Sequence, residues 1–356
     1  MYRNEKELQT LIRSIGPGEE RVRQEAHAHW DSLAKPLGSL GVLEEDLEQI
    51  AALQGNTEFG FFHRRAVVYC ADNGVTLEGV TQTDMSVTAA VLDQLAAGRS
   101  SVCQMARVAK CKVIPVDVGV RAYPGHPRVR SHRIGNGTGD IRTGPAMSRE
   151  QCLEAIWVGI DQMREFHEKD VGLVATGEMG IGNTTTSSAV ASVLLDRPVH
   201  EMTGRGAGLS TLMLEHKIDV ICEAVERNGP DPEDPVDVLA KVGGFDLAAL
   251  CGTFLGGAHY RIPVLMDGFI SSVAALCAVR LCPNARKAVL ASHLSTEPAA
   301  KAVLEALDAK PLIRAEFHLG EGTGAVAAIP LLEMAAAVYR NAYTFEEGGI
   351  PPYRPL

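Results

Sequence analysis

The chain has 356 residues, of which 46% are hydrophobic and 22% charged, a balance typical of a globular protein with a large buried core. It carries 34 Lys and Arg residues against 44 Asp and Glu residues, and the net charge of −10, without a long basic run, argues against a nucleic-acid partner. Only 5% of the residues are aromatic, whereas 35 are glycine. This composition favours closely packed helices and tight turns around a small ligand.

The cellular compartment is predicted from three absences in the sequence. Residues 1–16 mix charged and apolar residues at helical spacing and lack the apolar stretch of a signal peptide. The apolar run 269–279 is much shorter than the roughly 20 residues that a membrane helix needs. The eight cysteines form no C-x-x-C pair. We therefore expect a cytoplasmic protein with reduced, mostly buried thiols and no membrane partner.

Both ends of the chain have helical patterns. Within residues 1–60, Leu43, Leu47 and Ile50 fall on one helical face, and no β-branched run interrupts the pattern. Residues 324–340 are rich in alanine and predict another helix, with a kink at Pro330, before a loop or tail over 343–356. The polar, proline-rich stretch 228–235 predicts a surface connection between two helices.

The middle of the chain alternates short apolar runs with helical stretches. Each run is apolar throughout, as expected for a strand that is buried on both faces of a parallel sheet, and the runs lie at residues 66–70, 113–117, 172–175, 263–266 and 288–291. This pattern predicts an α/β fold with a doubly wound, mainly parallel sheet and helices on both faces. Ligands bind at the carboxyl ends of such strands, and small or polar residues follow the runs at 71–74, 176–180, 267–269 and 292–293.

Three glycine-dense segments, at residues 177–186, 204–208 and 320–324, each precede a helical pattern. Their backbone N–H groups could hold an anion, although a tight turn or a close helix contact explains a glycine cluster equally well. Asn183, Thr184 and Thr185 would add donors to the first segment, or simply cap a helix. No segment has the spacing of a dinucleotide fingerprint or a P-loop.

Several charged residues have both a structural and a functional interpretation. Glu321 lies among glycines before a helix, where it could be a general base or an acid stabilised by the helix dipole, and Glu178 has the same two interpretations. Lys217 lies beside an apolar helix face, where a lysine is usually solvated but could bind an anion. His293 and His318 lack metal-ligand spacing, so we expect no metal site.

Taken together and in order, six segments resemble the nicotinate-nucleotide:dimethylbenzimidazole phosphoribosyltransferase family of cobamide biosynthesis. The resemblance extends from about residue 30 to 340 and is carried by residues 35–41 (KPLGSLG), 70–75 (CADNGV), 177–185 (GEMGIGNTT), 241–246 (KVGGFD), 267–269 (DGF) and 319–324 (LGEGTG). It implies a pentosyltransferase that moves phosphoribose from nicotinate mononucleotide to an aromatic base, without a cofactor or metal. We expect a large α/β domain over 61–324 and a small helical domain from 1–60 and 325–356.

The resemblance also implies roles for individual residues. Glu321 matches the family's general base, and Glu178 matches a second acid that positions the ribose or stabilises charge at the reacting carbon. Lys217 matches a lysine at the phosphate. The turns around it would supply further phosphate or nucleotide contacts, from Gly180, Gly182, Asn183, Thr184, Thr185, Gly204 and Gly206.

The segment expected to line the base pocket departs from the family pattern. We assign Thr83, Val91 and Leu319 to the base, with Val91 at a position where some members have glutamine. Asn73 stands where the family usually has histidine. A less polar pocket would suit a phenol, the substrate of the family's paired-subunit members, whereas ordinary sequence drift would leave a benzimidazole as the acceptor.

Family members are dimers, so we expect either a homodimer or a heterodimer with a paralogue. A non-catalytic partner subunit is a rival interpretation, but such a subunit would not need the base Glu321. A nucleotide-binding oxidoreductase is a third interpretation, which the missing dinucleotide fingerprint opposes.

Overall fold

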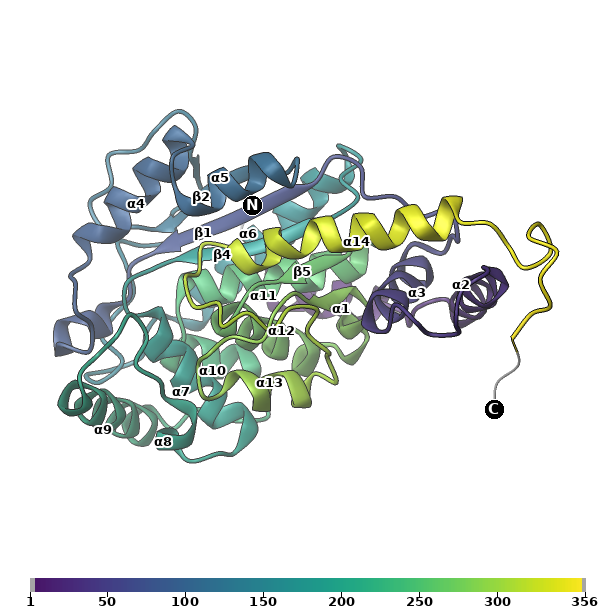
Figure 1. The fold of residues 1–356 in the computed structure, drawn as a ribbon. Coiled ribbons are helices and arrows are strands. Elements are labelled where there is room, and N and C mark those ends of the chain that lie inside the picture. Colours follow the sequence, from purple (N-terminus) through teal and green to yellow (C-terminus); the bar gives the residue numbers. More distant parts are fainter. Residues whose placement is uncertain (1–3, 354–356) are drawn as a thin grey trace.

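The computed structural model describes residues 4–353 (Figure 1). Residues 1–3 of the predicted N-terminal helical unit and residues 354–356 of the predicted tail lie outside this range. Among the described residues, six strands form one parallel sheet in the order β3-β2-β1-β4-β5-β6. They are β1 (Arg65–Ala71), β2 (Lys112–Gly119), β3 (Arg130–Ser131), β4 (Val174–Met179), β5 (Val264–Met266) and β6 (Val289–Ala291). The parallel α/β fold expected from the sequence is confirmed.

Alternate residues of each strand enter separate apolar cores on the two faces of the sheet. In β1, Val67 and Tyr69 pack on one face, whereas Val68 and Cys70 pack on the other. The first face is covered by α1 (Glu5–Ser14), α6 (Arg149–His167), α7 (Asn183–Leu195), α8 (Val199–Met202), α9 (Thr211–Asn228), α10 (Pro235–Val242), α11 (Phe245–Tyr260), α12 (Phe269–Leu281), α13 (Ala300–Ala306) and the 3₁₀ turn η2 (Pro283–Ala288). Because both faces are covered, each strand is apolar throughout.

The second face is covered by fewer helices, four from the first third of the chain and one from its C-terminal part. They are α2 (Glu20–Ser32), α3 (Val42–Gln54), α4 (Ser86–Ala97), α5 (Ser101–Val108) and α14 (Thr323–Asn341). In Figure 1, α2 and α3 lie beside the last turns of α14, beyond the end of the sheet. Since α1 packs on α11 instead, the N-terminal helices are divided between the two faces. The predicted division into two domains remains a prediction.

Glycine allows α6 and α11 to pack with their backbones almost touching. A Cβ atom at Gly252 would come within 1.8 Å of the carbonyl oxygen of Ile156, and one at Gly159 within 2.0 Å of that of Ala249. No other residue fits at such a distance, so part of the high glycine content is explained by this contact.

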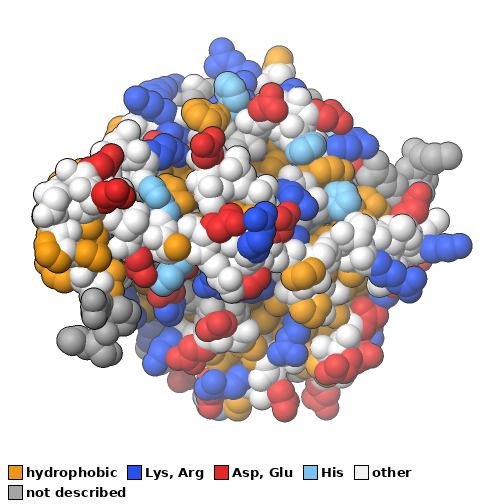
Figure 2. Space-filling view, turned by 90° about the vertical axis from the view of Figure 1, so that its right-hand side faces the viewer, with side chains coloured by type: hydrophobic (Ala, Val, Ile, Leu, Met, Phe, Trp, Pro, Cys, Tyr) orange, Lys and Arg blue, Asp and Glu red, His pale blue; other side chains and the backbone are white. Residues whose placement is uncertain are grey.

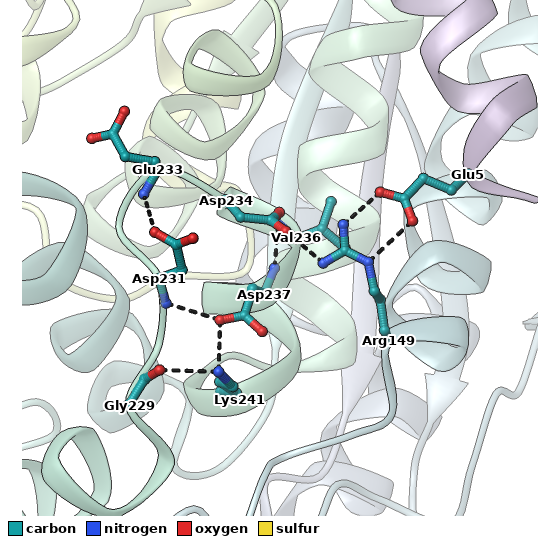
Figure 3. Close-up of polar contacts among 9 residues, drawn as sticks. All are labelled: Glu5, Arg149, Gly229, Asp231, Glu233, Asp234, Val236, Asp237 and Lys241. Atoms are coloured by element: carbon teal, nitrogen blue, oxygen red, sulfur yellow. Dashed lines mark hydrogen bonds and ion pairs between the residues drawn. The ribbon is translucent and has the colours of Figure 1, made fainter.

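An arginine fastens α1 to the rest of the first face (Figure 3). Arg149, the first residue of α6, donates hydrogen bonds to Glu5 of α1 and, at 2.7 Å, to Asp234. Asp234 is also the N-cap of α10 and accepts the N–H of Val236 at 3.0 Å. The connection before it joins α9 to α10, as the sequence predicts.

The charges on the surface and the state of the cysteines match the expectations from the sequence. On the face shown in Figure 2, acidic and basic side chains are interspersed, without a broad patch of one sign. Seven of the eight cysteines are buried and all are free, whereas Cys222 is exposed. Within residues 4–353, no helix is long and apolar enough to cross a membrane.

Candidate active site

The candidate site is a cavity of about 230 Å³ at the carboxyl end of the sheet. β1 and β4 are neighbours there, and the chain leaves them toward opposite edges of the sheet, which is where doubly wound folds bind ligands. Ten of the predicted site residues line the cavity: Thr83, Glu178, Gly180, Gly182, Asn183, Thr184, Gly206, Lys217, Leu319 and Glu321. Val91, Thr185 and Gly204 are outside this lining.

Glu321 lies on a sharp turn directly before α14. Gly320, Glu321 and Gly322 have φ angles of 86°, 59° and 90°, a left-handed conformation that glycine tolerates and glutamate rarely adopts. Asp267, which follows β5, accepts the N–H groups of Gly322 at 3.1 Å and Ala325 at 3.0 Å. One carboxylate oxygen of Glu321 accepts the N–H of Val102 at 3.2 Å. The turn is therefore held from both sides, which fixes the Glu321 carboxylate at the cavity.

Strand β4 touches this turn through Gly177. A Cβ atom there would come within 2.4 Å of the carbonyl oxygen of Glu321, so only glycine allows the approach. The next residue, Glu178, has its carboxylate at the cavity and is 8% exposed. The glycines at the end of β4 thereby bring two carboxylates, Glu178 and Glu321, to the same cavity.

Glu178 belongs to a buried acidic pair. The Nδ2 group of Asn183 donates hydrogen bonds to Glu178 and, at 3.0 Å, to Asp246. Burial, together with the negative charge of Asp246, raises the pKa of Glu178 to about 8. Burial also raises the pKa of Asp246 to about 6. Near neutral pH, the pair therefore holds one proton, whereas a glutamate or an aspartate exposed to water would be fully ionised at this pH.

The first turn of α7 closes another side of the cavity. Gly182 is the N-cap, with a φ angle of 93°, and Asn183 is the first helical residue. The N–H of Thr185 bonds to the carbonyl of Gly182 at 3.0 Å. The side-chain hydroxyl of Thr185 is buried and has no hydrogen-bond partner among the described residues. Thr184 instead faces α9, where its hydroxyl meets Lys217.

Lys217 is buried, with only 1% of its surface exposed. Its ammonium donates to the Thr184 hydroxyl at 3.0 Å and to the carbonyl of Gly204 at 3.1 Å. Burial lowers its pKa to about 8, against the opposing effect of the Glu297 carboxylate. Of the two interpretations of Lys217, the solvated one is wrong, because α9 buries the face that contains Lys217, Val220, Ile221 and Ala224.

The residues assigned to the base have different positions. Thr83 lies in the exposed segment before α4 and lines the cavity, as does Leu319, which is 56% exposed. Val91 lies within α4, packed against the core of the second face. Asn73 is fully buried after β1, and neither polar atom of its side chain has a hydrogen-bond partner within residues 4–353.

Comparison with known proteins decides the family. A family model described as phosphoribosyltransferase matches residues 15–350. The chain belongs to this phosphoribosyltransferase family. The resemblance found in the sequence is confirmed, and so is the assignment to the pentosyltransferases.

Relatives of this phosphoribosyltransferase match it over almost their full length. A nicotinate-nucleotide–dimethylbenzimidazole phosphoribosyltransferase from Ruminiclostridium cellulolyticum is 46% identical over 349 residues, which are 98% of this chain and 99% of the relative. A protein of the same name from Clostridium acetobutylicum is 42% identical, with the same coverage. The crystal structure of CobT from Thermus thermophilus superimposes with a TM-score of 0.89 at 37% identity, and covers 94% of this chain and all of that one.

Three charged residues of the phosphoribosyltransferase site received no role from the sequence. Asp246, Glu297 and Arg205 contact the predicted residues or line the cavity. Asp246 lies in the first turn of α11, where an acid is ordinarily explained by its favourable interaction with the helix dipole. Glu297 and Arg205 lie in loops, without any periodic pattern. Asp267 was detectable, because it directly follows a predicted strand.

Proposed function

We propose that the enzyme transfers phosphoribose from nicotinate mononucleotide to an aromatic lower-ligand base, releasing nicotinate and forming the α-riboside 5′-phosphate used in cobamide assembly. The observation that carries the proposal is the convergence of Lys217, Glu178 and Glu321 on a single cavity. These residues supply a cation for the phosphate and two carboxylates for the reacting centre. The names of the relatives support the same two substrates.

In this proposal, the phosphate binds between α7 and α9. Lys217 supplies the positive charge, and the N–H groups at the start of α7 and in the 204–208 loop supply hydrogen bonds. The thirty-four basic residues are outnumbered by forty-four acidic ones. A local site built from one buried cation and helix-end donors explains how such an acidic protein binds an anion.

Glu321 would act as the general base. An azole or phenol is a weak nucleophile while it holds its proton, so the Glu321 carboxylate takes that proton as the azole nitrogen or the phenol oxygen bonds to C1′ of the ribose. The C1′–nitrogen bond to nicotinate breaks on the opposite face, and its electron pair leaves with nicotinate, which inverts C1′. Ionised Glu178 would stabilise the positive charge that develops on the ribose. The step uses no metal or organic cofactor.

The acceptor we favour is 5,6-dimethylbenzimidazole or a related base. Phenol or p-cresol, with the chain acting as one subunit of a heterodimer, is the second candidate. It rests on the Thr83 region, which lines the cavity. The position of Val91 inside α4 weakens that candidate, since this residue carried much of the argument for a less polar pocket. A dimer and a cytoplasmic location are part of the proposal.

The test is a competition experiment with the purified protein. It receives nicotinate mononucleotide together with equal amounts of dimethylbenzimidazole and phenol, and the products are identified by mass spectrometry. The benzimidazole riboside phosphate is expected, and a phenolic riboside phosphate would favour the second candidate. The Glu321→Gln variant is the control for product formed without the base. If neither product appears with the wild-type chain alone, activity as a homodimer is contradicted.

A further inference from the structure

Glu297 places a negative charge inside the anion-binding part of the cavity. It lies in the loop between β6 and α13, and its Oε1 atom accepts the N–H of Gly206 at 3.1 Å. A Cβ atom at residue 204 would come within 1.9 Å of Oε2, so the carboxylate packs directly against the backbone of Gly204. Oε2 is buried, and no residue in the described range donates a hydrogen bond to it.

The charged groups around Glu297 come from separate elements. Lys217 of α9 contacts the opposite side of the same glycine loop, through its 3.1 Å hydrogen bond to the carbonyl of Gly204. His318, in the loop before α14, also lines the cavity. Burial raises the pKa of Glu297, and the charges of Lys217 and His318 only partly oppose this effect. The carboxylate is therefore held less firmly in its ionised form than a solvated glutamate.

In the proposed function, a phosphate at Lys217 would take hydrogen bonds from the 204–208 loop, including the Gly206 N–H that Glu297 now accepts. The single N–H of Gly206 cannot serve both anions fully, and the negative charge of the carboxylate would repel a phosphate that shares this donor. Glu297 and Pro298 both lie against Gly204 of the loop, and protonation of Glu297 would remove its charge and turn its free oxygen into a hydrogen-bond donor.

We propose that Glu297 competes with the substrate phosphate for the loop donors, and that phosphate binds together with a proton that neutralises this carboxylate. The inference rests on the proposed function, since it assumes that the phosphate lies at Lys217. Anion binding is thereby coupled to the uptake of one proton by Glu297. Because this proton is harder to gain at higher pH, anions bind more weakly as the pH rises.

Calorimetric titration tests the proposal with nicotinate mononucleotide and with inorganic sulfate, which keeps both of its charges across the range used. Titrations at pH 6.5 and 7.5, in two buffers of different ionisation enthalpy, measure the protons taken up. The wild type is expected to take up protons with sulfate, whereas Glu297→Gln takes up fewer. Because glutamine resembles the protonated acid, this variant is expected to bind sulfate about tenfold more tightly at pH 7.5.

Glu305→Gln is the matched control, because it removes one negative charge from the exposed face of α13. It should behave as the wild type. Equal proton uptake and equal sulfate affinity in the wild type and Glu297→Gln would overturn the proposal and leave Glu297 as a purely structural contact of the loop. If nicotinate mononucleotide binds to neither protein at either pH, the proposed function fails instead.

Discussion

Glu178 and Asp246 accept hydrogen bonds from the same nitrogen atom, Nδ2 of Asn183. Both acids are buried, and each makes ionisation of the other less favourable. Since the amide group donates to both, it stabilises the pair when one or both are ionised. The protonation of the cavity therefore depends on the pair and not on either acid alone.

Asp246→Asn should move the pH dependence of the reaction. The pKa of Glu178 is raised to about 8, mainly by burial and also by the charge of Asp246, so removal of that charge should lower it. If ionised Glu178 stabilises the transition state, the rising limb of kcat/KM against pH shifts to lower pH by the same amount. Asp219→Asn, on the exposed face of α9, is the control for net charge. An unshifted limb would show that Glu178 is not the titrating group.

Lys217→Met should raise the KM for nicotinate mononucleotide by roughly 10- to 100-fold, because methionine fills the space but cannot pair with a phosphate. The KM for the aromatic base should change little. The control is Lys241→Met, which removes a surface ammonium bonded to the carbonyl of Gly229 at 3.0 Å (Figure 3). Equal rises in both KM values would contradict the assignment of Lys217 to the phosphate.

Glu321→Gln should lower kcat by about 10²- to 10⁴-fold, the usual range for loss of a general base. The amide oxygen can still accept the N–H of Val102, so the thermal midpoint should stay close to that of the wild type. Glu316→Gln in the preceding loop is the matched control and should retain activity. A near-normal kcat in Glu321→Gln would remove this residue from the mechanism.

Asp46→Asn should stabilise the protein at alkaline pH. Burial raises the pKa of Asp46 from 3.8 to about 8, so the folded state keeps a proton that the unfolded state releases above pH 3.8. The stability of the wild type therefore falls between these two pH values, whereas asparagine does not titrate. At pH 8 the variant should be more stable by on the order of 5 kcal/mol, with almost no difference below pH 4.

Urea titrations at both pH values measure this difference. Glu45→Gln is the control. The Glu45 carboxylate is exposed, accepts a hydrogen bond from Lys310 at 2.7 Å and should contribute little to the free energy of unfolding. A gap between the wild type and Asp46→Asn that is the same at both pH values would mean that Asp46 titrates normally.

The sheet was largely predictable because its strands are buried on both faces. All five predicted apolar runs overlap strands, namely β1, β2, β4, β5 and β6. The short β3 was missed, since it consists only of Arg130 and Ser131 and pairs with two residues of β2. A strand of this length at the edge of a sheet leaves no apolar pattern in the sequence.

The site was predictable where it lies next to strands and glycine turns, and less so elsewhere. Strand ends and glycine clusters mark Glu178 and Glu321 as candidates, and the family resemblance supplied the roles expected of them. The burial of Lys217 was missed, because its ammonium is bonded to Thr184 of another helix and to Gly204 of the loop before α9, and neither contact follows from the periodicity of α9. Glu297 depends on the Gly206 N–H in the same way. Contacts between distant loops have no local signal.

The left-handed backbone of Glu321 has a consequence for selection. A glutamate at a φ angle of 59° is strained relative to glycine by about 1 kcal/mol. Glu321→Gly would therefore relieve strain while removing the proposed base. A library screened only for heat resistance should accumulate glycine at this position, and a screen for cobamide-dependent growth should restore glutamate. Activity therefore requires glutamate at position 321, whereas the backbone conformation there favours glycine.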